Sequence, residues 1–145
     1  MTFRHEHVLL LAGLALLGGT GCKKDAAPAS SGTATATTEV KISDVEIGRR
    51  LGANSRIAEA TDDFGPRDTI YVVAVTEGSA PNATITARWT YQDGQVVKED
   101  SRSIAPAGTE ATEFHISKPS GWPKGKYQVV VAVGGSTQTK DFEVK

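Results

Sequence analysis

Histidine is the side chain that most often moves protons in enzymes at neutral pH, and this chain offers one histidine for that role. His5 and His7 lie within the first seven residues, in a segment that has the features of an export signal, so a Ser-His-acid or Cys-His device would have to use His115. His115 alternates outward with Glu113 and Ser117 on a predicted strand. Such neighbours are about 7 Å apart along a sheet face, too far for a tight hydrogen bond unless the side chains bend. We therefore predict that His115 lies on a solvated strand face and that the chain has no catalytic residues.

Metal and phosphate chemistry find equally little support in the sequence. Asp62, Asp63 and Asp68 cluster in the segment TDDFGPRD, but this segment lacks the alternating acids and the glycine of an EF-hand calcium loop. At a zinc site, only carboxylates could join His115. The glycines occur singly or in predicted hairpins and form no phosphate-binding loop. The sequence predicts turn-forming aspartates, no metal site and no cofactor.

Charge and cysteine content exclude further classes. The chain has 145 residues, with 16 basic and 17 acidic side chains and a formal net charge of -1. A nucleic-acid-binding surface would need an excess of lysine and arginine, so nucleic acid is not an expected partner. The single cysteine, Cys22, makes an internal disulfide impossible.

Residues 1–21 have the three parts of a secretory signal. A short polar start carries Arg4, an apolar run covers residues 8–17, and small residues follow up to Gly21. The apolar run is shorter than the roughly 20 residues that a membrane-spanning helix needs. Removal of this segment would leave a chain that begins at Cys22.

The segment 22–38 is predicted to be a flexible tether that begins with a modified cysteine. After Cys22 it consists mainly of alanine, threonine, serine, proline and glycine, and its apolar side chains are no larger than alanine. Such a segment cannot bury enough surface to offset the entropy of ordering. An exposed free thiol is an oxidation liability in an exported protein, which favours a modified Cys22 over a free secreted cysteine.

From Glu39 onward the apolar pattern changes to the period of two that is typical of β-strands. One face of a predicted strand carries Ile85, Ala87, Trp89 and Tyr91, and the segments 112–117 and 127–133 alternate in the same way. About seven short strands at spacings of roughly 8–15 residues predict an all-β fold, an antiparallel immunoglobulin-like or fibronectin-III-like β-sandwich over residues 39–145. Trp89 is the expected core tryptophan.

Several strands carry finer signals. Asp93-Gly94 predicts a type I′ hairpin turn, and Gly134-Gly135 predicts a second hairpin. The segment 70–75 is apolar on both faces and is expected to be a central strand, whereas the first strand is expected to bulge near Ser43-Asp44. Charges crowd residues 98–102, which is the usual protection of a sheet edge.

The loop SKPSGWPKGKY, residues 117–127, has two possible roles. Its prolines and glycines fix its shape, and Trp122 adds a large apolar surface. In the first interpretation, Trp122 folds back and plugs the end of the sandwich. In the second, Trp122, Pro123 and Lys124 form an exposed contact for a protein partner.

Two resemblances extend this prediction. Thr20-Gly21-Cys22 resembles the end of a bacterial lipoprotein signal, in which the cysteine becomes the lipidated first residue, although Gly19 and Gly21 also fit ordinary signal cleavage at the same bond. Residues 45–145 resemble a group of small proteobacterial lipoproteins with an Ig-like domain and no assigned activity. The motifs that carry this likeness are FGPRDTIY from Phe64, ARWTYQDGQ from Ala87, FHISKPSGWPKGKY from Phe114 and FEV from Phe142.

The resemblance implies a fold and a location, and it carries over no catalytic residues. In the Gram-negative sorting pattern, aspartate after the lipidated cysteine favours the inner membrane. Lys23 stands at that position, so the resemblance implies an outer-membrane lipoprotein that faces the periplasm or the cell surface.

Three hypotheses about function follow from these features. The leading one is a lipid-anchored, non-enzymatic domain that binds or supports other components of the cell envelope. The second is an accessory or chaperone-like subunit of an envelope assembly that pairs through a sheet edge. A hydrolase is the third and weakest, because a second histidine and a metal set are missing from residues 22–145. In each case the chain is expected to be a monomer by itself.

Overall fold

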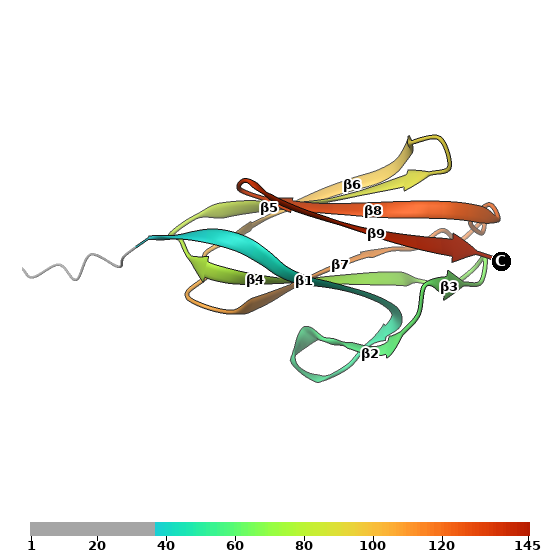
Figure 1. Ribbon diagram of the computed structural model, residues 1–145. Helices are drawn as coiled ribbons and strands as arrows, with labels where there is room; N and C mark the ends of the chain where they lie inside the picture. The colour runs from blue at the N-terminus through green and yellow to red at the C-terminus, as the bar shows by residue number, and fades with distance from the viewer. Residues whose placement is uncertain (1–36) are drawn as a thin grey trace, which may run out of the picture. The chain divides into compact units, whose positions relative to one another are not determined.

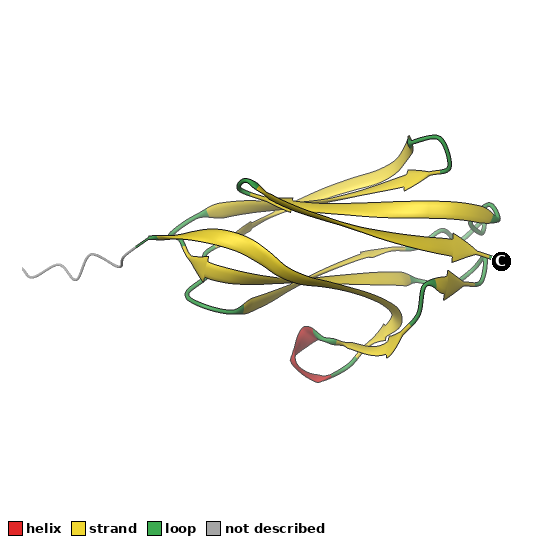
Figure 2. Ribbon diagram, in the orientation of Figure 1, coloured by secondary structure: helices red, strands yellow, loops and turns green. Residues whose placement is uncertain are grey.

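The fold is that of a computed structural model, which describes residues 37–145 (Figure 1). The predicted signal peptide, Cys22 and residues 23–36 of the predicted tether lie outside the described residues. The described part consists of strands joined by short loops, with one 3-10 turn at Ala53–Ser55 (Figure 2). The strands are β1 (Thr38–Leu51), β2 (Ile57–Ala60), β3 (Asp63–Phe64), β4 (Ile70–Ser79), β5 (Ala83–Tyr91), β6 (Gln95–Ile104), β7 (Glu110–Ile116), β8 (Gly125–Val133) and β9 (Ser136–Val144).

The strands form the two sheets of an Ig-like β-sandwich, as the sequence predicts. Sheet A has the order β2-β1-β4-β7, and sheet B has the order β3-β9-β8-β5-β6. All pairs are antiparallel except β3 with β9, in which Phe64 pairs with Val144. The seven longer strands match the predicted number of about seven. The two additional strands, β2 and β3, are four and two residues long, too short to show a period in the sequence.

The core follows the predicted alternation. Trp89 on β5 is 0% exposed, and its ring meets that of Phe114 on β7 edge to face at 6.3 Å between centroids. Every second residue of β5, β7 and β8 is buried, so both sheets contribute side chains to the core. These residues are Ile85, Ala87, Thr112, Phe114, Ile116, Tyr127, Val129, Val131 and Val133. Because the described part contains no cysteine, these packed faces hold the two sheets together.

The expected irregularities lie where the sequence places them, with one correction. The register of β1 against β4 shifts between Ile42 and Asp44, which confirms the predicted bulge, and the hairpin at 134–135 is confirmed. The β5–β6 hairpin also forms, but its turn is not a two-residue type I′ turn. Tyr91 pairs with Gln95 across a three-residue loop, in which Gln92 and Gly94 have φ of 44° and 89°. The third residue is accommodated because Gln92 adopts the left-handed conformation.

β4 is the central strand that its two-sided apolar sequence predicts. Val72 and Ala74 face the core, whereas Val73 and Val75 alternate to the outer face of sheet A and are buried there. The hairpin from β1 to β2, with its 3-10 turn, packs against β4 and β7 and curls back below sheet A in Figure 1. This hairpin covers part of the outer face of sheet A, which forms a second buried layer there.

The two ends of the sandwich carry different parts of the chain. At one end lie Thr38, where β1 begins, and the connections 80–82, 105–109 and 134–135 (Figure 1). At the opposite end lie the hairpin loop 92–94, the loop 117–124 and the C-terminal residue Lys145. We call the second end the loop end.

Candidate functional site

The loop 117–124 at the loop end is held by main-chain hydrogen bonds that fix the position of Trp122. The Gly121 N–H donates to the carbonyl of Lys118 at 2.8 Å, and the Trp122 N–H donates to the carbonyl of Pro66 at 2.6 Å. Gly121 has a φ of +86°, a conformation that favours glycine. The indole Nε1 of Trp122 donates to the carbonyl of Asp68 at 3.2 Å. The loop is therefore tied to the β3–β4 connection at two points.

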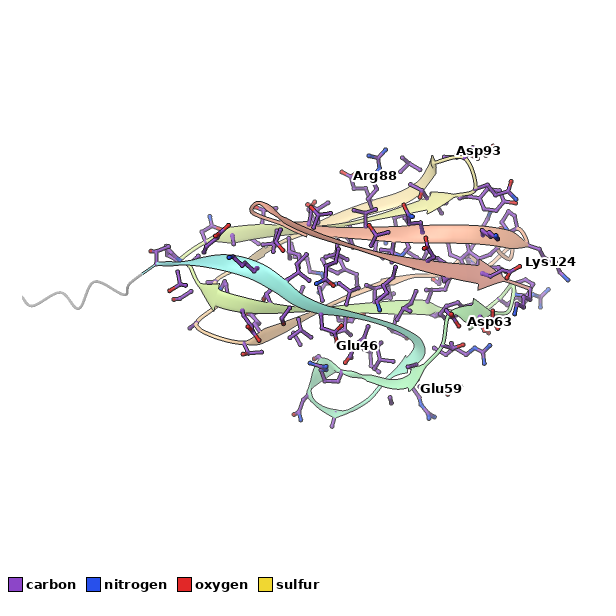
Figure 3. The ribbon with its side chains drawn as sticks, in the orientation of Figure 1. Glu46, Glu59, Asp63, Arg88, Asp93 and Lys124 are labelled. Atoms are coloured by element: carbon purple, nitrogen blue, oxygen red, sulfur yellow. The ribbon has the colours of Figure 1, made fainter. Side chains whose placement is uncertain are left out.

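Trp122 lies inside the sandwich end. Its side chain is 7% exposed and meets the ring of Tyr127 edge to face at 6.3 Å. This burial agrees with the interpretation of Trp122 as a plug and corrects the alternative in which its ring is freely exposed, because the bonds to Pro66 and Asp68 draw the ring inward. Pro123 and Lys124, the other two predicted contact residues, are exposed. Lys124 lies at the loop end in Figure 3.

Two tyrosines hold the loop through hydrogen bonds that the sequence pattern did not predict. The Tyr127 hydroxyl donates to the carbonyl of Pro123 at 2.8 Å, which is the tyrosine corner typical of Ig-like sandwiches. The Tyr91 hydroxyl donates to the carbonyl of Lys124 at 3.0 Å, and the two tyrosine rings lie 4.7 Å apart. The signal that could have revealed the corner is the tyrosine four residues after Pro123, near the start of a predicted strand.

The environment of Tyr127 makes alkaline stability a test of this support. Burial, together with the charge that Tyr91 can develop, raises the pKa of Tyr127 above its ordinary value of 10.0. Ionisation of an acid whose pKa is raised by folding favours the unfolded chain, so this contribution is present below pH 10 and is lost as the pH rises through the folded-state pKa. We expect the free energy of unfolding of the wild-type domain to fall above about pH 10, and to fall less steeply in Tyr127→Phe. Urea unfolding at pH 8 to 11 measures the difference, and parallel curves for the two proteins would contradict it.

A groove opens beside the loop, between it and the β5–β6 hairpin. It has a volume of about 300 Å³ and is lined by Tyr91, Gln95, Val96, Val97, Lys118, Trp122, Pro123 and Tyr127. Val96 is 45% exposed and is the one large hydrophobic side chain that residues 37–145 leave open to solvent. The register shift of β5 against β6 between Trp89 and Thr90 makes Val97 an extra residue and leaves Val96 opposite Thr90, on the outward side of sheet B. We call this feature the end groove.

The end groove joins an apolar floor to a cationic rim. The Lys118 Nζ lies over the Trp122 ring, 5.9 Å from its centroid, within the range of a cation–π contact. Two of the three predicted contact residues, Trp122 and Pro123, line the groove, whereas Lys124 lies outside its lining. Such a surface can bind an apolar side chain or segment of a partner.

His115 lies on the outer face of sheet A, as expected. Its Nδ1 and the Glu113 Oε1 are 2.6 Å apart, a hydrogen bond that the extended strand geometry allows only if the side chains bend. Both side chains bend toward each other over the sheet, which the alternation alone cannot show. The Tyr71 ring on β4 packs beside the imidazole, with 5.5 Å between ring centroids. This cluster stabilises the exposed face of β7.

Two of the three aspartates have side-chain partners, and the third, Asp62, accepts a hydrogen bond from the Glu143 N–H through its main-chain carbonyl at 2.7 Å. The Asp68 carboxylate accepts a hydrogen bond from the Gly65 N–H at 2.8 Å. It also forms an ion pair with the Arg49 Nε at 3.0 Å. Asp63 bonds to the Lys145 Nζ at 2.6 Å, and this hydrogen bond raises the pKa of Lys145. Across residues 37–145, no three histidine, cysteine or acidic side chains converge in a way that could hold a metal ion. The same stretch contains no helix with the length and apolarity to cross a membrane.

The comparisons with known proteins bear on the fold. No protein-family model and no curated protein matches the chain. Among solved structures, an immunoglobulin-like protein from Pseudomonas aeruginosa is similar, with 18% identity and a TM-score of 0.54 over 76% of this chain and 99% of that protein. The CARDB domain of a Pyrococcus furiosus protein, solved with two metal ions, matches with 14% identity and a TM-score of 0.50 over 76% of this chain and 90% of that domain.

A third similar structure is part of a much larger enzyme. A cycloisomaltooligosaccharide glucanotransferase from Paenibacillus sp. shares 16% identity and a TM-score of 0.55 over 72% of this chain. This chain spans only 14% of that enzyme. At these identities the likeness concerns architecture alone, and it shows that residues 37–145 form an Ig-like β-sandwich.

Proposed function

We propose that this chain is a lipid-anchored, non-enzymatic domain of the cell envelope that binds or supports another envelope component. The export signal in residues 1–21 and the cysteine that follows it support the anchor. The Ig-like sandwich supports a binding or structural role, because such folds present their loops on a rigid frame. Lys23 after Cys22 favours the outer membrane, and the likeness to small lipoproteins favours a proteobacterial source.

The observation that carries this proposal is the position of the end groove relative to the start of β1. Thr38 begins β1 at one end of the sandwich, and the residues that line the end groove belong to the loop end, opposite the start of β1 in Figure 1. An anchor that precedes Thr38 therefore joins the sandwich at the end opposite the end groove. An apolar surface in that position is free to meet a partner.

The end groove predicts a partner that is lost when Val96 becomes charged. In a pull-down from detergent-solubilised envelope, the wild-type protein is expected to retain a stoichiometric partner. Val96→Asp is expected to retain about tenfold less, because the partner would have to bury a carboxylate where the groove now presents an apolar side chain. Quantitative mass spectrometry of the recovered proteins measures the ratio.

Thr137→Asp is the matched control. Thr137 is exposed on β9 near the opposite end of the sandwich and receives the same charge. It is expected to leave partner recovery unchanged. Equal recovery of the partner with Val96→Asp and Thr137→Asp would show that the end groove does not bind the partner.

A free sheet edge favours the second candidate, an accessory or chaperone-like subunit that pairs by strand addition. β7 ends sheet A without a further partner strand in residues 37–145. The same pull-down separates the candidates. A subunit would keep its stoichiometric partner in Val96→Asp and lose it when the β7 edge is changed.

A further inference from the structure

β7 is an edge strand of sheet A, and β6 is an edge strand of sheet B. The two strands differ in how they are protected against pairing with a strand of another chain. β6 ends sheet B and carries alternating charges at Lys98, Asp100 and Arg102. These residues stand opposite the core-facing residues of β5, so they point toward the inside of the sandwich, and Arg102 lies 5.2 Å from the centre of the Phe114 ring. Inward charges and a bulge at Val97 both discourage strand addition at β6.

The edge of β7 lacks these protections. Its seven residues pair with β4 in continuous register, from Ile70 with Ile116 to Thr76 with Glu110. The strand contains no lysine, arginine, proline or glycine. Sheet A also has one strand fewer than sheet B, so a strand added beside β7 would bring it to the same number. The structure therefore offers β7 as an open edge.

The sequence of β7 is complementary to itself when two copies run antiparallel about Phe114. In that register Glu113 stands opposite His115 of a second copy, and His115 stands opposite its Glu113. The buried face pairs Thr112 with Ile116 and Phe114 with Phe114.

Neighbouring registers lose this complementarity. A shift by one residue would place core-facing side chains opposite outward ones, which the pleat of a sheet does not allow. The next allowed register toward the start of β7 sets Glu113 against Glu113, and the next toward its end sets His115 against His115. The register about Phe114 is the one of these three in which both outward residues face a complementary side chain.

We propose that two copies of this chain pair through their β7 edges in the antiparallel register centred on Phe114, which makes one continuous sheet from two copies of sheet A. The sequence alone predicts a monomer, whereas the proposed pairing would make a symmetric dimer. The pairing uses a side of the sandwich rather than its loop end, so it does not depend on the proposed role of the end groove. It also commits the β7 edge to a second copy rather than to a strand from another protein.

A charge exchange between two copies tests this pairing. Full-length chains with two different affinity tags are co-expressed and extracted in detergent, and capture through one tag is scored by recovery of the other. Wild-type copies are expected to capture each other. When both copies carry Glu113→Lys, the introduced ammonium group faces His115, and when both carry His115→Glu, Glu113 faces a second carboxylate. Each matched combination is expected to recover about tenfold less of the second copy.

The decisive combination joins one copy of each variant. The lysine introduced by Glu113→Lys then faces the glutamate introduced by His115→Glu, and the unchanged His115 of the first copy faces the unchanged Glu113 of the second. Capture is therefore expected to return to the wild-type level. A contact within one chain cannot produce this rescue, because neither variant keeps the original Glu113–His115 pair. Glu99→Lys on β6, which makes the same charge change at the other edge, is expected to leave capture unaltered.

Three results would overturn the proposal: absence of capture between wild-type copies, unchanged capture with Glu113→Lys in both copies, or no recovery in the mixed combination. The first result would leave the β7 edge to a strand from a different protein. Thermal melts of each variant show whether it folds. If a variant does not fold, the double substitution Ala111→Cys and Ser117→Cys replaces it, because these residues face each other across the proposed pair and would form a disulfide between copies. Absence of that disulfide under oxidising conditions would equally overturn the proposal.

Discussion

Replacement of Trp89 by alanine is expected to unfold the domain or to lower its melting temperature sharply. The indole is fully buried between the sheets and contacts Phe114 across the core. Truncation of a buried tryptophan costs about 3–5 kcal/mol, through lost transfer free energy and the cavity that remains. A small domain has a total free energy of unfolding of about 5–15 kcal/mol. Thermal and urea unfolding of a protein that covers residues 37–145 measures the loss.

Trp122→Ala provides the comparison for this prediction. Trp122 is also buried, but it lies in a loop at the sandwich end, where the surrounding chain can relax into the space that the ring leaves. We expect Trp122→Ala to cost less than Trp89→Ala and to weaken partner recovery at the end groove. Equal and small losses at both positions would mean that Trp89 has been assigned to the wrong sheet face.

Replacement of Cys22 by serine is expected to move the protein from the membrane fraction to the soluble fraction of the periplasm. Serine cannot carry the lipid that the signal resemblance implies. A single acyl chain binds a membrane only marginally, whereas several chains, at about 0.8 kcal/mol per buried CH₂, anchor a protein stably. Cell fractionation followed by a salt wash measures the change.

The control for the anchor prediction is Ser30→Ala, in the predicted tether, which removes a hydroxyl and leaves Cys22 intact. It is expected to remain with the membranes. If the Cys22→Ser protein also stays in the washed membranes, the lipid on Cys22 is not what holds the chain there.

The fold was largely predictable because burial alternates along the longer strands. Trp89, Phe114 and Val131 lie in the core because every second side chain of their strands points toward the opposite sheet. The charged segment at 98–102 was correctly predicted to form a sheet edge, since β6 ends sheet B. The bulge near Ser43 follows from a break in the alternation of β1.

Features that depend on contacts between distant segments could not be predicted in this way. The Trp122 ring is held by Pro66 and Asp68, more than 50 residues earlier in the chain, and no local pattern encodes that meeting. The three-residue turn at 92–94 depends on a left-handed Gln92, a conformation that glutamine seldom adopts.

The end groove needed the structure for a similar reason. It exists because the bulge at Val97 and the loop 117–124 meet at the loop end. The sequence pointed to Trp122, Pro123 and Lys124 as partner contacts but could not show that the tryptophan ring turns inward. It also gave no sign that Val96, on a different hairpin, would be the exposed apolar side chain beside them.

Lipid anchoring is tested most directly by the intact mass of the mature protein extracted from bacterial membranes. A lipid-anchored protein is expected to begin at Cys22 and to be heavier than residues 22–145 by the mass of a diacylglyceryl group, with or without a further acyl chain. Fragmentation is expected to place all of the added mass on Cys22. A mature chain that begins at Cys22 with an unmodified thiol, or one that retains residues 1–21, would contradict the proposal that this sandwich is anchored to a membrane by lipid.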